Sequence, residues 1–112
     1  MNFEVKVKED WVLFSISDRL DSFSHDDFTQ AMEKALSDGK RCVALDLGRT
    51  RFLSMPTIKY VSNIAERLSH NGGRFALLRT PEKLKRQIQI FASLKPMLVF
   101  RSQEDWEKYS TI

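Results

Sequence analysis

The N-terminal part of the chain alternates between apolar and polar side chains, which is the period of a strand with one buried face. The stretch FEVKVK places Phe or Val at every second position of residues 3–8, and the run WVLFSIS follows at residues 11–17. Only Glu9 and Asp10 separate the two runs. This pattern predicts an N-terminal hairpin.

After residue 20 the apolar positions adopt the period of helices. Ser24 is expected to act as the N-cap of a helix over 24–38, because Asp26 and Asp27 fall in its first turn, where the helix dipole favours negative charge. A second helix is predicted over 56–70. Its inner face is apolar and comprises Ile58, Val61, Ile64, Ala65 and Leu68.

Two runs of nearly continuous apolar residues, CVALDLG at 42–48 and RFALLR at 74–79, indicate strands that are covered on both faces. Thr80 is expected to cap a third helix in which Pro81 is the first residue. The segment MLVF then predicts a last short strand, and Ser102 is expected to start a final helix.

The predicted order of elements is ββαβαβαβα, with about four helices. Helices that alternate with apolar strands predict an α/β fold with right-handed crossovers and a mostly parallel central sheet. The N-terminal β-hairpin adds an antiparallel strand at one edge. No linker or repeat divides the chain, so we expect a single domain over residues 1–112.

Composition places the chain in an ordinary class. The hydrophobic share of 42% and the charged share of 29% are typical of globular proteins. Neither a secretory signal nor a run of membrane-spanning length is present, so we expect a cytoplasmic protein without membrane insertion. The single cysteine, Cys42, cannot form an internal disulfide and is expected to be a small buried hydrophobic residue.

The net charge of +3 hides an asymmetry between two parts of the chain. Residues 1–50 hold 7 Lys and Arg against 10 Asp and Glu, whereas residues 51–112 hold 11 against 5. The excess concentrates over residues 74–95, which either mark a footprint for an anionic partner or form a solvated helix face. The basic residues of the third helix fall on different sides of it, and neither an RNA-binding sheet nor a helix-turn-helix pattern is present. A nucleic acid is therefore not the expected partner.

Enzymatic chemistry has few candidates in this sequence. His25 and His70 fall at opposite ends of different predicted helices, and with one cysteine they give no metal-ligand spacing. Gly72 and Gly73 lack the third glycine of a dinucleotide loop and are interpreted as a helix terminator. Asp46, near the end of its strand, is expected to be the partner of a neighbouring helix N-terminus. We therefore expect no catalysis, no cofactor and no bound metal.

The stretch FLSMPTIKY joins the apolar strand to the second helix. Such a junction favours an anion, because the N–H groups of the first helical turn have no partner within the helix. Here it holds Ser54, Met55, Pro56 and Thr57, with neither glycine nor carboxylate. Ser54 is expected to cap the helix, and Pro56 suits the first turn, where its missing N–H costs nothing.

Taken in order, these stretches resemble the STAS domain, the fold of bacterial anti-sigma factor antagonists that also occurs in sulfate transporters and stressosome proteins. DRLDSFSHDDFTQAMEKAL is similar to the family's turn and first helix, and VALDLGRTRFLS is similar to its central strand. The family continues with Asp-Ser-Ser-Gly-Leu and a helix that ends in a glycine pair. Placing Ser54 on that aspartate brings Ile58 onto the leucine and Gly72-Gly73 onto the glycine pair without a gap. The resemblance covers essentially the whole chain.

The family's switch motif is altered in this chain. In the family a partner kinase phosphorylates the second serine, and here Met55 and Pro56 occupy the two serine positions while Thr57 replaces the glycine. Because Pro56 has no hydroxyl, it cannot be phosphorylated. The resemblance implies a non-enzymatic regulatory domain that binds an anti-sigma factor or serine kinase-like protein independently of phosphorylation there. A subunit or scaffold of a transporter or stressosome-type assembly, a switch phosphorylated at Ser54 or Thr57, and a homodimer remain open alternatives.

The resemblance also implies where a protein partner would bind. Asp21 matches an acidic residue near the family's binding surface, and the altered junction and the outward face of the second helix adjoin it. The expected partner-binding residues are Asp21, Ser54, Met55, Pro56, Thr57, Lys59, Ser62, Asn63 and Glu66, with Arg67 on the same face. Replacing Thr57 by Asp is expected to weaken the complex and to leave the fold intact, because the helix dipole favours the charge.

Overall fold

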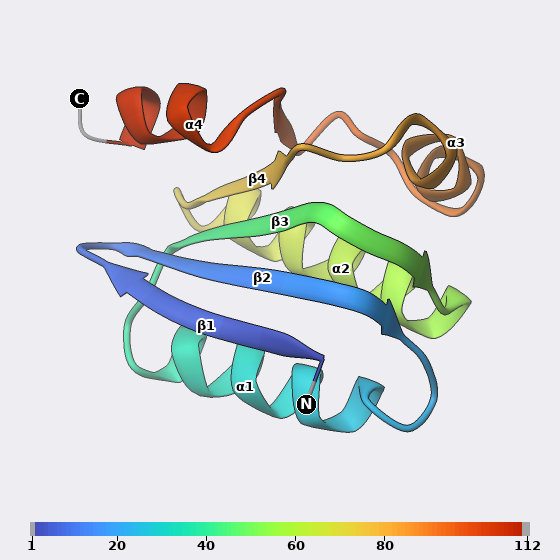
Figure 1. The fold of residues 1–112 in the computed structure, drawn as a ribbon. Coiled ribbons are helices and arrows are strands. Elements are labelled where there is room, and N and C mark those ends of the chain that lie inside the picture. Colours follow the sequence, from blue (N-terminus) through green and yellow to red (C-terminus); the bar gives the residue numbers. More distant parts are fainter. Residues whose placement is uncertain (1, 111–112) are drawn as a thin grey trace.

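The computed structural model describes residues 2–110, and these residues form a five-stranded sheet with four helices (Figure 1). The strands lie side by side in chain order, from β1 to β5. Their bounds are β1 Phe3–Lys8, β2 Trp11–Leu20, β3 Cys42–Leu53, β4 Arg74–Leu78 and β5 Leu98–Phe100. The helices are α1 His25–Ser37, α2 Met55–His70, α3 Glu82–Phe91 and α4 Gln103–Ser110.

The predicted sheet topology is confirmed. β1 pairs with β2 in antiparallel fashion, and every following pair is parallel, with β3 in the centre. The two-residue hairpin loop holds Glu9 at φ 55°, the left-handed conformation that such a tight turn uses. β3 is longer than the predicted strand, because it continues past Gly48 to Leu53 and so carries the chain directly into α2.

The larger core lies between the sheet and α1, α2 and α3. Because crossovers between parallel strands are right-handed, successive connections in one direction put their helices on one face of the sheet. Alternate residues of the strands point into this core and meet Phe28 and Met32 of α1, the apolar face of α2, and Leu84 and Ile88 of α3. The ring of Phe28 packs edge-on against Phe14, with 5.4 Å between the ring centroids.

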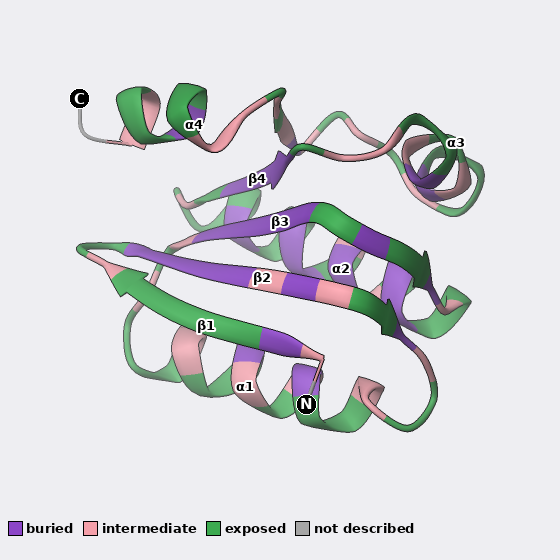
Figure 2. Cartoon of the chain, in the orientation of Figure 1, coloured by how far each residue is buried: buried purple, intermediate pink, exposed green. Residues whose placement is uncertain are grey.

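The opposite face of the sheet is covered by α4 over only part of its area. Trp106 of α4 is buried against Trp11, with ring centroids 5.5 Å apart, and Ala44 and Ala76 lie beneath them. Beyond α4 the same face carries polar side chains, among them Asp46. β3 is therefore covered on both faces only in its first half, which holds the predicted apolar run: residues 43–47 are all buried, and exposed residues follow from Gly48, as the burial pattern in Figure 2 shows.

The predicted N-cap residues of three helices differ in whether they form capping hydrogen bonds. Ser102 accepts a hydrogen bond from the Asp105 N–H at 3.1 Å, as expected of a cap. Ser24 occupies the N-cap position of α1, but its hydroxyl makes no capping hydrogen bond and instead bonds to Asp21. Thr80 was expected to cap α3, and this prediction is wrong: Pro81 holds the N-cap position, and the buried Thr80 Oγ1 has no hydrogen-bond partner among the described residues.

Candidate functional site

The junction between β3 and α2 is held by hydrogen bonds at Ser54. Its N–H donates to the carbonyl of Leu20 at 2.9 Å, which ties the end of β3 to the end of β2. Its hydroxyl accepts from the Thr57 N–H at 3.4 Å and lies 2.9 Å from the Thr57 hydroxyl. Pro56 stands in the first turn, where no intrahelical donor is needed. The sequence-based prediction of Ser54 as the cap of α2 is confirmed.

Thr57 is fully buried, with 0% of its surface exposed. Its Oγ1 lies 2.8 Å from Nδ1 of His25, at the start of α1. A continuous chain of side chains, His25–Thr57–Ser54, therefore joins the first turns of two helices. Either tautomer of His25 satisfies this chain, because the two hydroxyls can reverse the direction of their hydrogen bonds. No local pattern in the sequence predicts the contact between His25 and Thr57.

Asp21 shapes the turn that leads from β2 into α1. Its Oδ1 accepts from the N–H of Phe23 at 3.0 Å and from the N–H and hydroxyl of Ser24 at 3.3 Å each. The Phe23 N–H is the main cause that lowers the pKa of Asp21, with a smaller contribution from Ser24. Through these local hydrogen bonds Asp21 stabilises the turn at the edge of the candidate surface.

The turn built by Asp21 exposes an aromatic side chain next to the junction. Phe23 is 92% exposed, and Met55 and Phe52 are also exposed large apolar side chains. The guanidinium of Arg19 lies over the Phe52 ring, 5.6 Å from its centroid. Sequence reasoning missed Phe23 and Phe52, although Phe23 falls outside the apolar phase of α1, which was the available signal.

The outward face of α2 is partly engaged within the molecule. Both terminal guanidinium nitrogens of Arg67 donate to Glu33 of α1, at 2.9 and 3.1 Å, and the Tyr60 hydroxyl donates to the same carboxylate. The bond to Arg67, followed by that to Tyr60, lowers the pKa of Glu33, while burial and the Glu33 charge raise the pKa of Tyr60. Arg67 is therefore committed to holding α1 and α2 together. The exposed predicted residues that remain on this face are Met55, Pro56, Lys59, Asn63 and Glu66, with Ser62 partly buried.

Asp46 lies away from this surface, on the open face of the sheet. Both its oxygens accept from Arg79 at 2.9 Å, and one also accepts from the Gly48 N–H at 3.0 Å. The expectation that Asp46 would serve a helix N-terminus is therefore wrong. Arg79 adopts φ 53° and its guanidinium covers Gly48, where a Cβ would stand 2.5 Å from Arg79 Cζ. This arrangement gives Asp46 a structural role.

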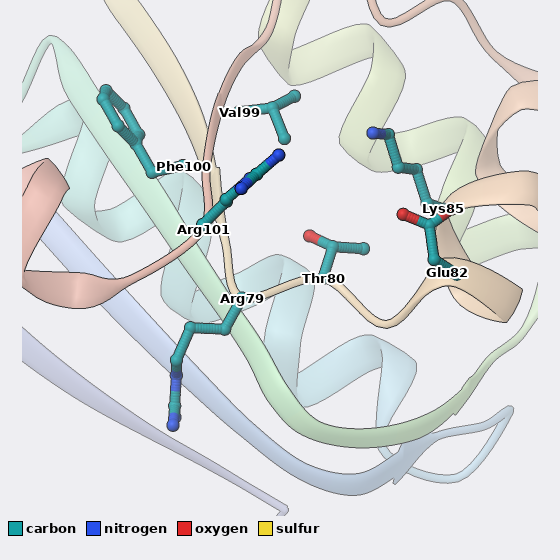
Figure 3. A pocket seen from close by; sticks show the side chains of 7 residues that line it. All are labelled: Arg79, Thr80, Glu82, Lys85, Val99, Phe100 and Arg101. Carbon is teal, nitrogen blue, oxygen red and sulfur yellow. The ribbon is translucent and has the colours of Figure 1, made fainter.

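A hollow of about 560 Å³ follows β4 and β5 and is lined in part by Thr80, Lys85 and Arg101. Figure 3 shows that Arg79, at its border, turns its guanidinium away from these side chains. Only part of the hollow is formed by the basic segment 74–95, because the rest of its lining comes from residues 99–101. Neither His25 nor His70 lines it, nor does Asp46.

Two further absences concern the described part of the chain. Within residues 2–110, no group of three or more His, Cys, Asp or Glu side chains is placed to hold a metal ion. None of the described helices combines the length and the apolar character that crossing a membrane requires.

The model of the STAS domain family matches residues 2–105. The chain belongs to this family. Among solved structures, a candidate anti-sigma factor antagonist from Thermotoga maritima superposes with a TM-score of 0.85 at 19% identity, over 98% of this chain and 95% of that one. An anti-sigma factor antagonist from Mycobacterium paratuberculosis superposes with a TM-score of 0.81 at 18% identity, over 98% of this chain and 93% of that one. The unphosphorylated form of the anti-sigma factor antagonist SpoIIAA superposes with a TM-score of 0.78 at 15% identity, over 97% of this chain and 96% of that one. The comparison with curated proteins found no match.

These likenesses establish the STAS fold of the chain. The identities are below the level at which a partner or a switch can be transferred from one protein to another. Function must therefore be argued from the side chains at the junction of this chain.

Proposed function

We propose that this STAS domain is a non-enzymatic regulatory module of the anti-sigma factor antagonist type, which binds a protein partner without phosphorylation at the family's usual position. The observation that carries the proposal is Pro56, which stands at the start of α2 where the resemblance places the modified serine. The surrounding surface is exposed and apolar at Met55 and Phe23. A surface that keeps its apolar anchors and loses its phosphate acceptor suits constitutive recognition.

The proposed contact surface has an apolar centre and a polar rim. Phe23 and Met55 supply large apolar side chains, which are the usual anchors of protein interfaces. Lys59, Asn63 and Glu66 supply a mixed polar border along α2, which is typical of the rim. Aromatic and Met side chains are enriched at the centres of interfaces, so we expect the first two to contribute most of the binding energy.

The hydroxyls at the junction serve the fold in this arrangement. Thr57 is enclosed, so a kinase reaches it only if α1 and α2 separate. Ser54 is partly buried, and a phosphate there would replace the cap of α2 while standing at a helix N-terminus that favours anions. A switch at Ser54 is therefore the second candidate, and the observation that favours it is this position at the end of β3.

The test begins with the partner. The tagged chain and its Phe23→Ser variant serve as matched baits in extracts of the cells that encode the protein, and bound proteins are identified by mass spectrometry. We expect an anti-sigma factor or serine kinase-like protein that binds the wild-type bait and is lost from the Phe23→Ser bait. Ile90→Ser is the control, because Ile90 is another largely exposed apolar side chain, on α3. Recovery of a transporter or a large assembly would support the scaffold alternative instead.

The switch is tested with the purified partner. Phosphate on Ser54 in protein from those cells, together with loss of affinity in Ser54→Asp and retention in Ser54→Ala, would establish regulation at that residue. We expect no phosphate there and similar affinities for wild type and Ser54→Ala. The proposal also places the protein in the cytoplasm, where such regulators act.

A further inference from the structure

The two edges of the sheet differ in how open they are to another strand. β5 is three residues long, and short edge strands are one way in which proteins avoid pairing with other chains. β1 is six residues long, contains no proline, and pairs with β2 in an unbroken register. Figure 2 shows most of β1 as exposed. Among the described residues, β1 has a neighbouring strand on one side only.

The register of the hairpin decides which backbone groups β1 offers to a new strand. The carbonyl of Asn2 accepts from the Ser17 N–H at 2.8 Å, so these two residues form a hydrogen-bonded pair. In an antiparallel ladder such pairs alternate with pairs whose N–H and C=O groups point away from the neighbour. The outward backbone groups of β1 therefore belong to Phe3, Val5 and Val7.

The same three residues carry the side chains that face α1. Val5 is 44% exposed and Val7 63% exposed, although both point to the side of the sheet that is otherwise the main core. With Ala31 and Ala35 of α1 they line a mostly apolar groove of about 310 Å³, whose lining also includes Lys34, Asp38 and Lys40. The groove runs along the open edge, so a strand added to β1 would cover these exposed valines.

The charges on β1 select one kind of partner strand. Glu4 and Lys6 lie on the opposite side of the strand from the valines and are exposed. When a second β1 pairs antiparallel about a two-fold axis through Val5, Val5 meets its own copy and Glu4 stands directly opposite Lys6 of the second copy, twice. Shifting the register by two residues instead opposes Lys6 with Lys6, or Glu4 with Glu4. Opposite charges directly across a ladder stabilise it and like charges destabilise it, by roughly 0.2–1 kcal/mol per pair.

We propose that the β1 edge is a homodimerisation site, at which a second copy of this chain adds its own β1 in the Val5-centred antiparallel register. The two sheets then form one continuous ten-stranded sheet. Strand addition supplies backbone hydrogen bonds, the valines supply apolar contact, and the two Glu4–Lys6 pairs fix the register. The contact uses residues of β1 and α1 and none of the proposed partner-binding residues of α2, so the dimer is independent of the function proposed above.

A charge-reversal series tests the register. Sedimentation velocity at low salt, over protein concentrations from micromolar to near millimolar, measures the dimer. We expect Glu4→Lys and Lys6→Glu each to weaken dimerisation about tenfold or more, because each replaces two attractive pairs with two repulsive ones. The double variant carries the same pairs in reversed order and should dimerise like wild type. Lys83→Glu, on α3, is the control for net charge.

Mixing the two single variants gives a second readout. Glu4→Lys has lysine at both positions 4 and 6, and Lys6→Glu has glutamate at both, so a mixture should form heterodimers that native mass spectrometry resolves by mass. Thermal melts of all variants check that the hairpin itself is intact. A monomer at every concentration in wild type would overturn the proposal. Single variants that dimerise like wild type, or a double variant and a mixture that stay monomeric, would overturn it as well.

Discussion

Two junctions of this molecule lead from a parallel strand into a helix with a hydroxyl residue and a proline, and they are held in different ways. At the first, Ser54 caps α2 and Thr57 continues the hydrogen-bond chain to His25 of α1. At the second, Thr80 caps nothing and its hydroxyl is buried without a partner among the described residues. There the anchor is the residue before it, Arg79, which pairs with Asp46 across the sheet.

The position of the proline explains the difference. Pro56 stands two residues after Ser54, inside the first turn, so the serine is free to take the extended backbone of a cap, with ψ 154°. Pro81 follows Thr80 directly and itself occupies the N-cap position, with ψ 144°. Proline has no side-chain oxygen to accept from the first turn, and Thr80 lies one residue too early to reach it. A shift of one residue thus separates a capped junction from an uncapped one.

The largest expected effect comes from placing a charge inside the first junction. Thr57→Asp introduces a carboxylate where the side chain has no exposed surface, and removing a charged group from water costs several kcal/mol. We expect a large fall in the free energy of unfolding, measured by urea denaturation. The structure thus argues against the sequence-based expectation that the fold would tolerate this change.

Met55→Asp is the matched control for that variant. It places the same charge two residues earlier in the same first turn, on an exposed side chain, where the helix dipole favours it. We expect its stability to stay within about 0.5 kcal/mol of wild type. Equal losses in the two variants would contradict the buried role assigned to Thr57.

A smaller effect is expected at the second junction from Gly48→Ala. The added Cβ would stand 2.5 Å from Arg79 Cζ, so the guanidinium must move and the nearly buried Asp46 loses its charged partner. We expect a loss of roughly 2 kcal/mol in urea denaturation. In an Arg79→Ala background the same glycine change should cost much less, because nothing remains to clash. Additive losses in this double-mutant cycle would show that the glycine serves some other purpose.

A matched pair of hydroxyl deletions compares the two junctions directly. Ser54→Ala removes a working cap and should cost about 1 kcal/mol. Thr80→Val keeps the shape of the side chain and removes a hydroxyl that has no partner, so it should leave stability unchanged or raise it. The measurement is the thermal melt of both variants beside wild type. A clear loss of stability in Thr80→Val would show that its hydroxyl is satisfied in solution.

The comparison also shows how far sequence reasoning reaches in this chain. Local patterns predicted the element order, the parallel centre of the sheet and the start of α2, because hydrophobic period and capping residues act within a few positions. Local patterns could not predict the hydrogen-bond partners of Thr57 and Asp46. His25 lies 32 positions from Thr57, and Arg79 lies 33 positions from Asp46. Such contacts depend on how strands and helices are placed, which no local pattern records.

Within the candidate site the same limit applies. The helical phase correctly predicts that Met55, Pro56, Lys59, Asn63 and Glu66 are exposed, whereas Thr57, which was also expected to contact the partner, is buried. The exposure of Phe23 depends on the turn that Asp21 builds, and the engagement of Arg67 depends on the packing of α1 beside α2. Whether these surface residues bind a partner stays a prediction.

The smallest expected effect concerns the ion pair that joins α1 and α2 beside the first junction. Glu33 and Arg67 are each about half exposed, so solvent screens the pair and its contribution is at most about 1 kcal/mol. Because its bonds lower the pKa of Glu33 from the usual 4.5, the folded state favours the ionised carboxylate. The stabilisation is therefore complete above about pH 4.5 and is lost as the pH falls through the lower pKa of the folded state.

Glu33→Gln should melt slightly below wild type at pH 7, and the difference should shrink on acidification below pH 4.5. Glu66→Gln removes the same charge from α2, where no ion pair is present among the described residues, and should show no such convergence. A Glu33→Gln difference that stays constant from pH 7 to pH 3 would mean that packing of the side chain, and not its charge, holds the two helices together.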